Sequence, residues 1–325
     1  MSGGELDRQR PAAAPPPPIS VVVCTRDRAE LLRGCLAALG QLDYPCYEVI
    51  VVDNAPRDEA TARVVAEGPF RYEREERPGL NWARNRGLAA ARHPIVAYVD
   101  DDARAASGWL RGLAAAFGDP EVAAVTGLVV PAQLETPAQR RFEEYGGMGK
   151  GSLPRTFRGG ALRPRDLIAA HAVGVGANMA FRREVFEHVG RFDPALDVGT
   201  PAQGAGDLDM FHRVLAAGLT LRYEPAAVVA HQHRRDLAGL RRQIFANGRS
   251  FGVYLIKIWA RRTVERRAVG AFAARWAGGW VVRRCVTTSL QGPRGQAALA
   301  WAELLGLLTA PWAYYLTYHS ERDRL

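Results

Sequence analysis

Three consecutive carboxylates, Asp100, Asp101 and Asp102, follow the apolar run Ile95–Val99. Such a run is typical of a buried strand, so the carboxylates lie where the strand leaves its sheet. Adjacent carboxylates repel one another unless a cation or hydrogen-bond donors balance their charge. These residues therefore predict either a ligand site at a sheet edge or a solvated acidic turn, and taken alone they leave both interpretations open.

A histidine far along the chain is a candidate partner for these acids. His231 follows the apolar segment Val228–Ala230 and opens the sequence His231-Gln232-His233. Imidazole, carboxylates and phosphate oxygens together suit Mn²⁺ or Mg²⁺ rather than a structural zinc. We therefore expect the aspartates to hold one of these cations near a pyrophosphate, with His231 as a further ligand. A purely structural histidine is the alternative.

A second group of acids occurs in Gly206-Asp207-Leu208-Asp209, where the pattern predicts the start of a helix. A carboxylate at that position is favoured by the exposed amides and by the helix dipole. Asp207 is thus a candidate for proton transfer, and capping of the helix is the structural alternative.

The elements that must position these side chains alternate between strands and helices. Such alternation predicts an α/β fold with a parallel sheet and right-handed crossovers. Ligands of these sheets bind beyond the carboxyl ends of the strands. The polar residues that would converge there are Thr25–Asp27 after the run Ile19–Cys24, Asp53-Asn54 after Tyr47–Val52, and Asp100–Asp102.

Beyond these strands the pattern predicts a helix over 108–117 and strands over 122–130, 173–181 and 219–223. The glycine-rich stretch 145–160 interrupts it, and we interpret this stretch as a mobile loop over the site. Neither a P-loop sequence nor Gly-x-Gly-x-x-Gly follows the first strand, which disfavours both phosphate-binding motifs.

The chain has 325 residues, 48% of them hydrophobic, and a formal net charge of +9. From His231 onward there are 16 Lys and Arg against 5 Asp and Glu, a net +11. This C-terminal part is predicted to be helical and contains apolar, aromatic-rich patches, among them 304–318, which is interrupted by Pro311. The patch is shorter than the ~20 residues of a membrane span, so we expect a segment on an anionic membrane surface or a helix packed on the rest of the protein.

The four cysteines form no Cys-x-x-Cys pair, which fits a reduced cytoplasmic interior. The N-terminal residues contain the run Pro15–Pro18 and no apolar core of signal-peptide length, so they are interpreted as a disordered leader. We predict three parts: a leader over 1–18, an α/β domain over 19–235, and a basic helical extension over 236–325.

An ordered set of stretches resembles the family-two glycosyltransferases, which have the GT-A nucleotide-sugar fold with helices on both faces of the sheet. The set covers about residues 19–235, and no single stretch is specific by itself. The stretches are Val21–Arg28, Val49–Asn54, Gly79–Gly87 with Arg84 inside it, Asp100–Asp102, and Gly206–Asp209.

The resemblance implies a role for each matching residue. Thr25 and Asp53 would hold the nucleoside, Arg84 would approach the nucleotide, Asp100 would contact the ribose side, and Asp102 would bind the metal together with Asp100 and His231. Arg26 and Asp101 are assigned to the same donor site. Asp207 would be the catalytic base, and Asn178 and Asp209 would contact the acceptor.

Two departures from the family's pattern matter. Gly206 stands where the family often has Glu, so an acceptor contact from that Glu is in doubt while the acid at Asp207 is kept. The Gln-x-x-Arg-Trp signature of processive members is absent from the sequence, which favours transfer of one sugar or a few.

The resulting hypothesis is inverting, metal-dependent transfer of a sugar from a nucleoside diphosphate sugar to a hydroxyl. The acceptor would be a glycan or lipid-linked glycan in cell-envelope polysaccharide or glycolipid synthesis, at the inner face of the cell membrane. The alternatives are a sugar-phosphate nucleotidyltransferase and a non-catalytic nucleotide-sugar-binding or membrane-assembly protein. Nucleic acid is not expected as a partner.

Overall fold

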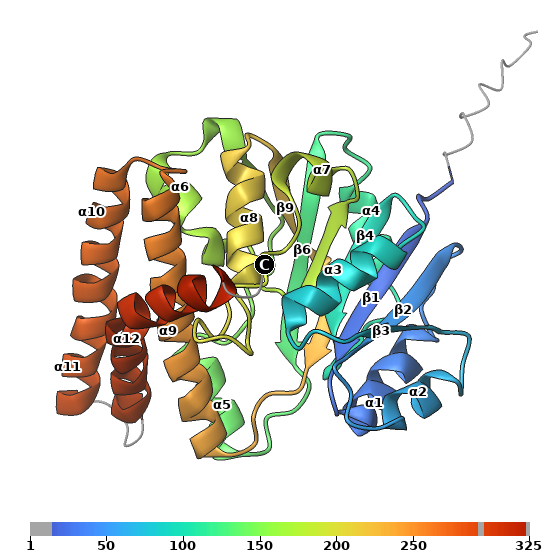
Figure 1. The fold of residues 1–325 in the computed structure, drawn as a ribbon, viewed down its shortest axis with the longest axis horizontal. Helices are drawn as coiled ribbons and strands as arrows, with labels where there is room; N and C mark the ends of the chain where they lie inside the picture. The colour runs from blue at the N-terminus through green and yellow to red at the C-terminus, as the bar shows by residue number, and fades with distance from the viewer. Residues whose placement is uncertain (1–14, 292–295, 323–325) are drawn as a thin grey trace, which may run out of the picture.

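The computed structural model describes residues 15–291 and 296–322, so residues 1–14 of the predicted leader lie outside the described residues. The described chain folds around one nine-stranded sheet of order β3-β2-β1-β4-β8-β6-β9-β5, with β7 paired to β9 (Figure 1). The strands are β1 (Ile19–Thr25), β2 (Tyr47–Asn54), β3 (Arg71–Glu75), β4 (Ile95–Asp100), β5 (Ala103–Ala105), β6 (Val122–Pro131), β7 (Arg155–Arg158), β8 (Asn178–Arg182) and β9 (Thr220–His231).

The sheet is mixed, whereas the sequence predicted a parallel one. Strands β3, β2, β1 and β4 run parallel, as do β6 and β9, but β8 is antiparallel to both of its neighbours. Strands β5 and β7 also pair antiparallel with β9. The alternation of strand and helix therefore gave the correct class, but the prediction of a parallel sheet was wrong for β8, and β5 and β7 were not predicted as strands.

Helices cover both faces of the sheet, with an apolar core on each side. One face carries α1 (Ala29–Leu39), α2 (Ala60–Val65) and α4 (Trp109–Ala116), while the other carries α3 (Leu80–Ala90), α7 (Val185–Val189) and α8 (Gly206–Ala216). Strand residues alternate between the two cores: Val22 faces the second set of helices, and Val21 and Val23 face the first.

The remaining elements lie between the sheet and the C-terminal helices. They are α5 (Pro137–Tyr145), the short α6 (Pro164–Ile168), and the 3₁₀ turns Gly159–Ala161 and Ala170–Ala172. The stretch 145–160, predicted as a loop, contains β7 in its second half. The strand predicted over 173–181 begins only at Asn178, because a 3₁₀ turn over Ala170–Ala172 and a second turn, in which the Asn178 amide donates to the Val175 carbonyl, precede it.

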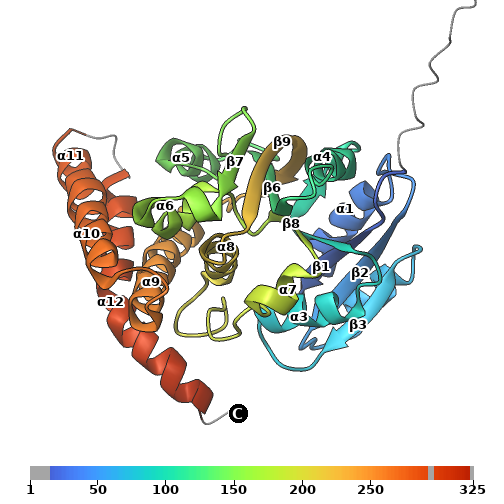
Figure 2. The ribbon, with the colours of Figure 1, turned by 90° about the horizontal axis from the view of Figure 1, so that it is seen from above.

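In the described part of the chain four α-helices follow the last strand and stand together beside the sheet, next to α8 (Figures 1 and 2). They are α9 (Leu237–Arg261), α10 (Arg266–Trp276), α11 (Arg283–Gln291) and α12 (Gln296–Arg322), with a π-helical turn over Ala277–Val282 joining α10 to α11. Glycine permits α9 and α12 to cross closely: a Cβ added at Gly306 would lie 2.1 Å from the carbonyl oxygen of Phe245.

Helix α9 attaches this group to the rest of the molecule through buried polar contacts. The Tyr254 hydroxyl donates to the carbonyl of Ile168 at 3.1 Å. The ammonium of Lys257 lies 2.7 Å from carboxylate oxygens of both Asp193 and Asp209. No helix in the described ranges is long and apolar enough to cross a membrane.

Candidate functional site

Two acids and a histidine from distant parts of the chain meet at the sheet edge. One ligand atom from each of Asp100, Asp102 and His231 lies within 4.8 Å of the others. Oδ1 of Asp102 is 3.2 Å from Nε2 of His231. Two carboxylates and an imidazole form a donor set that Mn²⁺ or Mg²⁺ accepts. These are the three residues that the sequence predicted as metal ligands.

The pairing of β5 with β9 explains how His231 reaches the acids. Strand β4 ends at Asp100, and after two residues β5 places Ala103 opposite His231. The amide of Gln232 also donates to the carbonyl of Asp102 at 2.9 Å. His231 in turn contacts His233 through their Nδ1 atoms at 3.2 Å. The sequence contained no sign of the strand pairing that brings His231 to the acids.

A network of donors balances the charge of the acidic run. The Thr25 hydroxyl donates to Asp101 at 2.7 Å, and the Arg28 guanidinium bridges Asp101, at 2.8 Å, and Asp102. Burial raises the pKa of Asp101 to about 7, against the opposing effect of Arg28. Burial alone would also raise the pKa of Asp102, but His231 and Arg28 outweigh it and hold that pKa below its usual range.

Arg28 is a site residue that the sequence interpretation did not select, although it ends the matching stretch Val21–Arg28. Arg26, which was selected, is exposed, whereas Arg28 is half-buried against the acids. The backbone turns at Asp27, whose φ is +52°. This turn directs the second arginine of the loop, and not the first, toward the carboxylates.

Asp53 lies at the end of β2, one strand away from Thr25 in register. Its buried carboxylate accepts a hydrogen bond from the Tyr72 hydroxyl at 3.0 Å, and burial raises its pKa. Asp53 and Thr25 therefore occupy neighbouring strand ends, as predicted, on the side of the acidic run away from α8.

Asp207 lies in the first turn of α8 and is held by two backbone amides. Oδ2 accepts from the amide of Gly176 at 2.7 Å, and Oδ1 accepts from the amide of Leu208 at 2.9 Å. Gly176 separates this carboxylate from Arg84, since a Cβ added there would lie 2.9 Å from both Oδ2 of Asp207 and Nη2 of Arg84. Arg84, a buried residue of α3, is thus adjacent to Asp207.

The glycine at position 206 has a steric explanation. A Cβ at Gly206 would lie 2.2 Å from the side-chain nitrogen of Asn81. That amide donates to the carbonyls of Asp193 and Leu196 at 2.9 and 2.8 Å. The volume that a glutamate would need at position 206 is therefore filled by Asn81.

Asn178 and Asp209 do not lie at the cavity described below. Asn178 is fully buried; its side-chain oxygen accepts from the Trp109 indole at 2.9 Å, and its nitrogen donates to the carbonyls of Leu128 and Ala227. Asp209 is buried between Arg213, at 2.8 Å, and Lys257, at 2.7 Å. Because these polar atoms are committed to protein partners, we leave both residues out of the proposed acceptor site.

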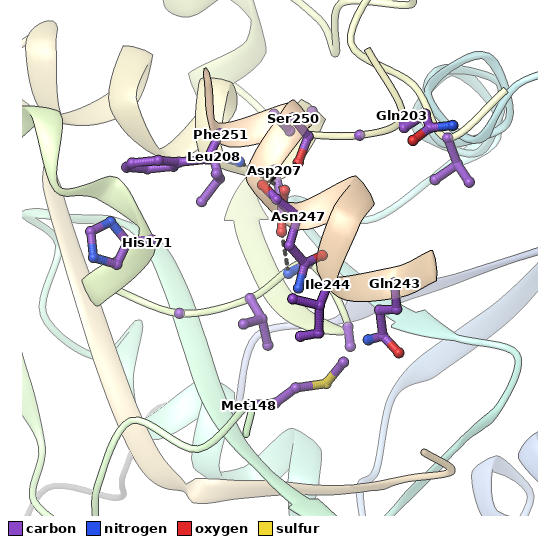
Figure 3. Close-up of a pocket in the computed structure, with 18 of the residues that line it drawn as sticks. Met148, His171, Gln203, Asp207, Leu208, Gln243, Ile244, Asn247, Ser250 and Phe251 are labelled. Atoms are coloured by element: carbon purple, nitrogen blue, oxygen red, sulfur yellow. Dashed lines mark hydrogen bonds between the residues drawn. The ribbon is translucent and has the colours of Figure 1, made fainter. Parts of the chain in front are cut away.

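A cavity of about 680 Å³ joins the acidic edge to the C-terminal helices. Asp100 and Arg84 line one end, Asp207 and Gly176 lie along it, and residues of α9 to α12 form the far wall. Figure 3 shows Ile244, Asn247 and Phe251 of α9 in the cavity that Asp207 also lines. The glycine-rich stretch contributes Gly146, Gly147, Met148 and Lys150 to the lining of the cavity. This segment therefore borders the site, as predicted.

Lys150 adds a positive charge that the sequence did not single out. It lines the cavity, and burial lowers its pKa while the nearby charge of Asp207 opposes that effect. Around Asp207 and Asp100 the cavity thus brings the cations Arg84 and Lys150 together with a carboxylate that accepts hydrogen bonds from two amides, and with one member of the metal-binding set. Such a set can hold a diphosphate at one end and accept a proton from a hydroxyl beside it.

Comparisons with known proteins agree with this geometry. Residues 20–190 match the model of the family described as glycosyl transferase family 2. The chain is 30% identical over 223 residues to a pre-mycofactocin glycosyltransferase of Mycobacterium tuberculosis, covering 67% of this chain and 43% of that relative. It is 29% identical over 184 residues to a glucosyl-dolichyl phosphate glucuronosyltransferase of Haloferax volcanii, covering 54% of this chain and 56% of that one.

A solved structure supports the fold. The mannosyltransferase PcManGT from Pyrobaculum calidifontis, in complex with GDP-Man and Mn²⁺, is similar with a TM-score of 0.59 and 20% identity, over 91% of this chain and 87% of that chain. The described sheet with helices on both faces is accordingly a GT-A fold. With more than half of its residues matching the family model, the chain belongs to glycosyl transferase family 2.

Proposed function

We propose that the protein transfers a sugar, with inversion, from a nucleoside diphosphate sugar to an acceptor hydroxyl. The observation that carries this proposal is that Asp100, Arg84 and Asp207 line one cavity. Asp207 takes the proton of the acceptor hydroxyl, whose oxygen bonds to the anomeric carbon on the face opposite the diphosphate. The bond from that carbon to the diphosphate oxygen breaks, and the diphosphate leaves with the electron pair.

The chain's own residues prepare this displacement. Arg84 and Lys150 offer positive charge to the diphosphate, and the amides of Gly176 and Leu208 orient the Asp207 carboxylate. Thr25 and Asp53 at the neighbouring strand ends are proposed for the nucleoside, with Asp101 and Arg28 behind them. Asp100, Asp102 and His231 would hold Mn²⁺ or Mg²⁺, which offsets the charge that develops on a leaving diphosphate.

The acceptor in this proposal is a glycan or lipid-linked glycan of the cell envelope, and the enzyme acts at the inner face of the membrane. One relative is named for glucosyl-dolichyl phosphate, which is a lipid-linked sugar. The described part of α12 supports the membrane contact, because five large side chains at spacings of four and three residues are between 49% and 66% exposed. These residues, named here the α12 stripe, are Trp301, Leu305, Leu308, Trp312 and Tyr315.

The α12 stripe occurs in a region of net charge +11 from His231 onward. Aromatic rings favour the membrane interface, and each basic residue near anionic lipid contributes about 1 kcal/mol. The predicted alternative, a segment packed on the rest of the protein, would bury its large aromatic side chains. It fits less well, since Trp259, Trp280, Trp301 and Trp312 are each at least 45% exposed.

The function is tested by incubating the protein with a panel of nucleoside diphosphate sugars, with and without Mn²⁺. Release of the nucleoside diphosphate and protection from thermal unfolding are measured for each sugar. We expect one donor, or a few, to protect the protein and to be turned over only with the metal. A panel that gives neither protection nor turnover would contradict the proposal.

A further inference from the structure

The cavity extends past Asp207, away from the metal-binding acids, into a compartment whose wall is built by the C-terminal helices. Helix α9 contributes Gln243 and Asn247, which are one turn apart and so lie on the same face of the helix. Among the described residues no group is hydrogen-bonded to either carboxamide, and neither side chain is buried. A carboxamide offers both donors and an acceptor, which is the combination that a sugar's hydroxyl groups require.

Two indole rings from the joint between α10 and α11 lie in the same compartment. Trp276 ends α10 and stacks at an angle on Phe251 of α9, with ring centroids 4.5 Å apart. Trp280, four residues later, lies in the π-helical turn and is 53% exposed. Single π-helical turns occur frequently at functional sites. An exposed ring in a cavity provides a flat apolar surface that fits the C–H face of a pyranose.

A fixed polar cluster supports the Trp280 ring. The Arg284 guanidinium lies 3.6 Å from the centre of the Tyr145 ring and 5.0 Å from that of Trp280, and it donates to the Tyr145 carbonyl at 2.8 Å. The Tyr145 hydroxyl donates to Glu303 at 2.5 Å. Arg284 and Glu303 both line the cavity, so a ligand there meets a guanidinium and a carboxylate beside the rings.

We propose that this compartment binds a sugar unit of the acceptor, with Asn247 and Gln243 bonding its hydroxyls and Trp280 stacking on its face. The inference rests on the proposed function, since it takes Asp207 as the boundary between donor and acceptor. A purely apolar acceptor would leave the two carboxamides without hydrogen-bond partners, which costs binding energy. A hydroxyl-rich ring satisfies them and also covers the indole.

The test uses the full chain and methyl glycosides of glucose, galactose, mannose and N-acetylglucosamine as probes. Tryptophan fluorescence measures binding of each glycoside without any donor, and release of nucleoside diphosphate measures coupling to donor turnover. We expect at least one glycoside to change the fluorescence saturably and to be used as acceptor. In Asn247→Ala its Kd and KM should rise about tenfold, the scale of one lost hydrogen bond to a sugar.

The double variant Gln243→Ala/Asn247→Ala should show a larger rise, and Trp280→Ala should abolish the fluorescence change. Matched controls lie outside the cavity: Arg242→Ala, next to Gln243 on α9, and Trp259→Ala, an exposed indole, should keep the wild-type Kd. The conservative variant Asn247→Gln should restore part of the affinity. Variants are compared only after their thermal unfolding has been matched to that of the wild type.

The outcomes separate this inference from the proposed function. Saturable glycoside binding that the α9 variants weaken supports the sugar site even if every donor fails. Donor turnover that no glycoside stimulates, or that dodecanol stimulates instead, overturns the sugar assignment while leaving the transferase function in place. Equal glycoside affinity in wild type and double variant also overturns it.

Discussion

The cavity joins two regions of the molecule, a sheet end and a helical end, that differ in how their polar groups are held. At the sheet end, Thr25, Arg28, Asp101, Asp102 and His231 form one connected network on strand ends and the loops that follow them. At the helical end, Gln243 and Asn247 project from α9 with no hydrogen-bond partner for their carboxamides among the described residues. The first arrangement suits one kind of ligand, a diphosphate with a cation. The second leaves its hydrogen bonds to be completed by a ligand.

This difference has an energetic basis. A charged group that is buried without a partner is costly, so the acids at the sheet end require their pairs even before a ligand binds. Uncharged carboxamides near solvent carry no such cost and can remain open. A substitution at the sheet end is therefore expected to lower the affinity for the charged diphosphate and its cation. A substitution at the helical end is expected to lower the discrimination between acceptors.

The largest effect is expected at the sheet end from Asp102→Ala. The substitution removes a carboxylate from the metal-binding set and leaves Arg28 and His231 without their shared partner. Metal-dependent donor binding should be lost, a change of about 100-fold or more in affinity. Titration of the donor with and without Mn²⁺ measures it, with the exposed Asp43→Ala as control. Equal affinities for both proteins under both conditions would refute the metal assignment.

Asp207→Asn tests the boundary between the two ends. The amide can still accept from Gly176, but it cannot take a proton at neutral pH. Transfer should fall by roughly 10² or more, the usual scale for a lost general base, while donor affinity persists. Single-turnover rates and donor Kd values are the measurement. Full turnover in the variant would place the base at another residue.

Asp209→Asn serves as the contrasting variant, because Asp209 is buried between Arg213 and Lys257 and does not line the cavity. Leaving Lys257 with Asp193 as its remaining carboxylate partner should lower the melting temperature. We therefore expect Asp207→Asn to lower the transfer rate and Asp209→Asn to lower the stability, although the two residues are only two positions apart.

The same contrast explains what the sequence predicted. Asp100, Asp102 and His231 could be found because strand ends gather at one edge of a sheet, and strands are visible as apolar runs. Arg28 was missed because the choice between it and Arg26 depends on the backbone turn at Asp27. The helical wall was missed altogether, since Asn247, Trp280 and Arg284 come from separate helices and share no motif. Their proximity depends on how α9 to α12 pack.

The α12 stripe gives a third way to separate the two ends, since it lies only on the helical side. Leu305→Glu/Leu308→Glu should weaken binding to anionic vesicles by about tenfold or more, because two apolar side chains can no longer be buried in lipid. Co-sedimentation across a salt series measures it, with Leu153→Glu, 74% exposed on the loop before β7, as control. Wild-type binding to vesicles that does not depend on the lipid charge would refute the membrane contact.

The smallest effect concerns His212, which ties the two regions together. From α8 its ring contacts the Leu167 carbonyl at 3.1 Å and the Thr263 hydroxyl at 2.8 Å, just beyond α9. Burial lowers the pKa of His212; Leu167 and Asp209 oppose this shift, and Lys257 and Arg213 add to it. The folded protein therefore binds this proton less readily than the unfolded chain, whose histidines titrate near about 6.5.

The sign of the pH dependence follows from that difference. Above about pH 6.5 the ring is neutral in both states, and its stabilising contacts are fully present. As the pH falls below that value, the unfolded chain takes up the proton first, so the free energy of unfolding decreases. Between pH 7.5 and 5 the melting temperature of the wild type should fall more steeply than that of His212→Gln. In the control His188→Gln, which changes an exposed histidine, the melting temperature should depend on pH as in the wild type. Parallel curves of melting temperature against pH for all three proteins would contradict the prediction that a neutral His212 imidazole links the helices to the sheet.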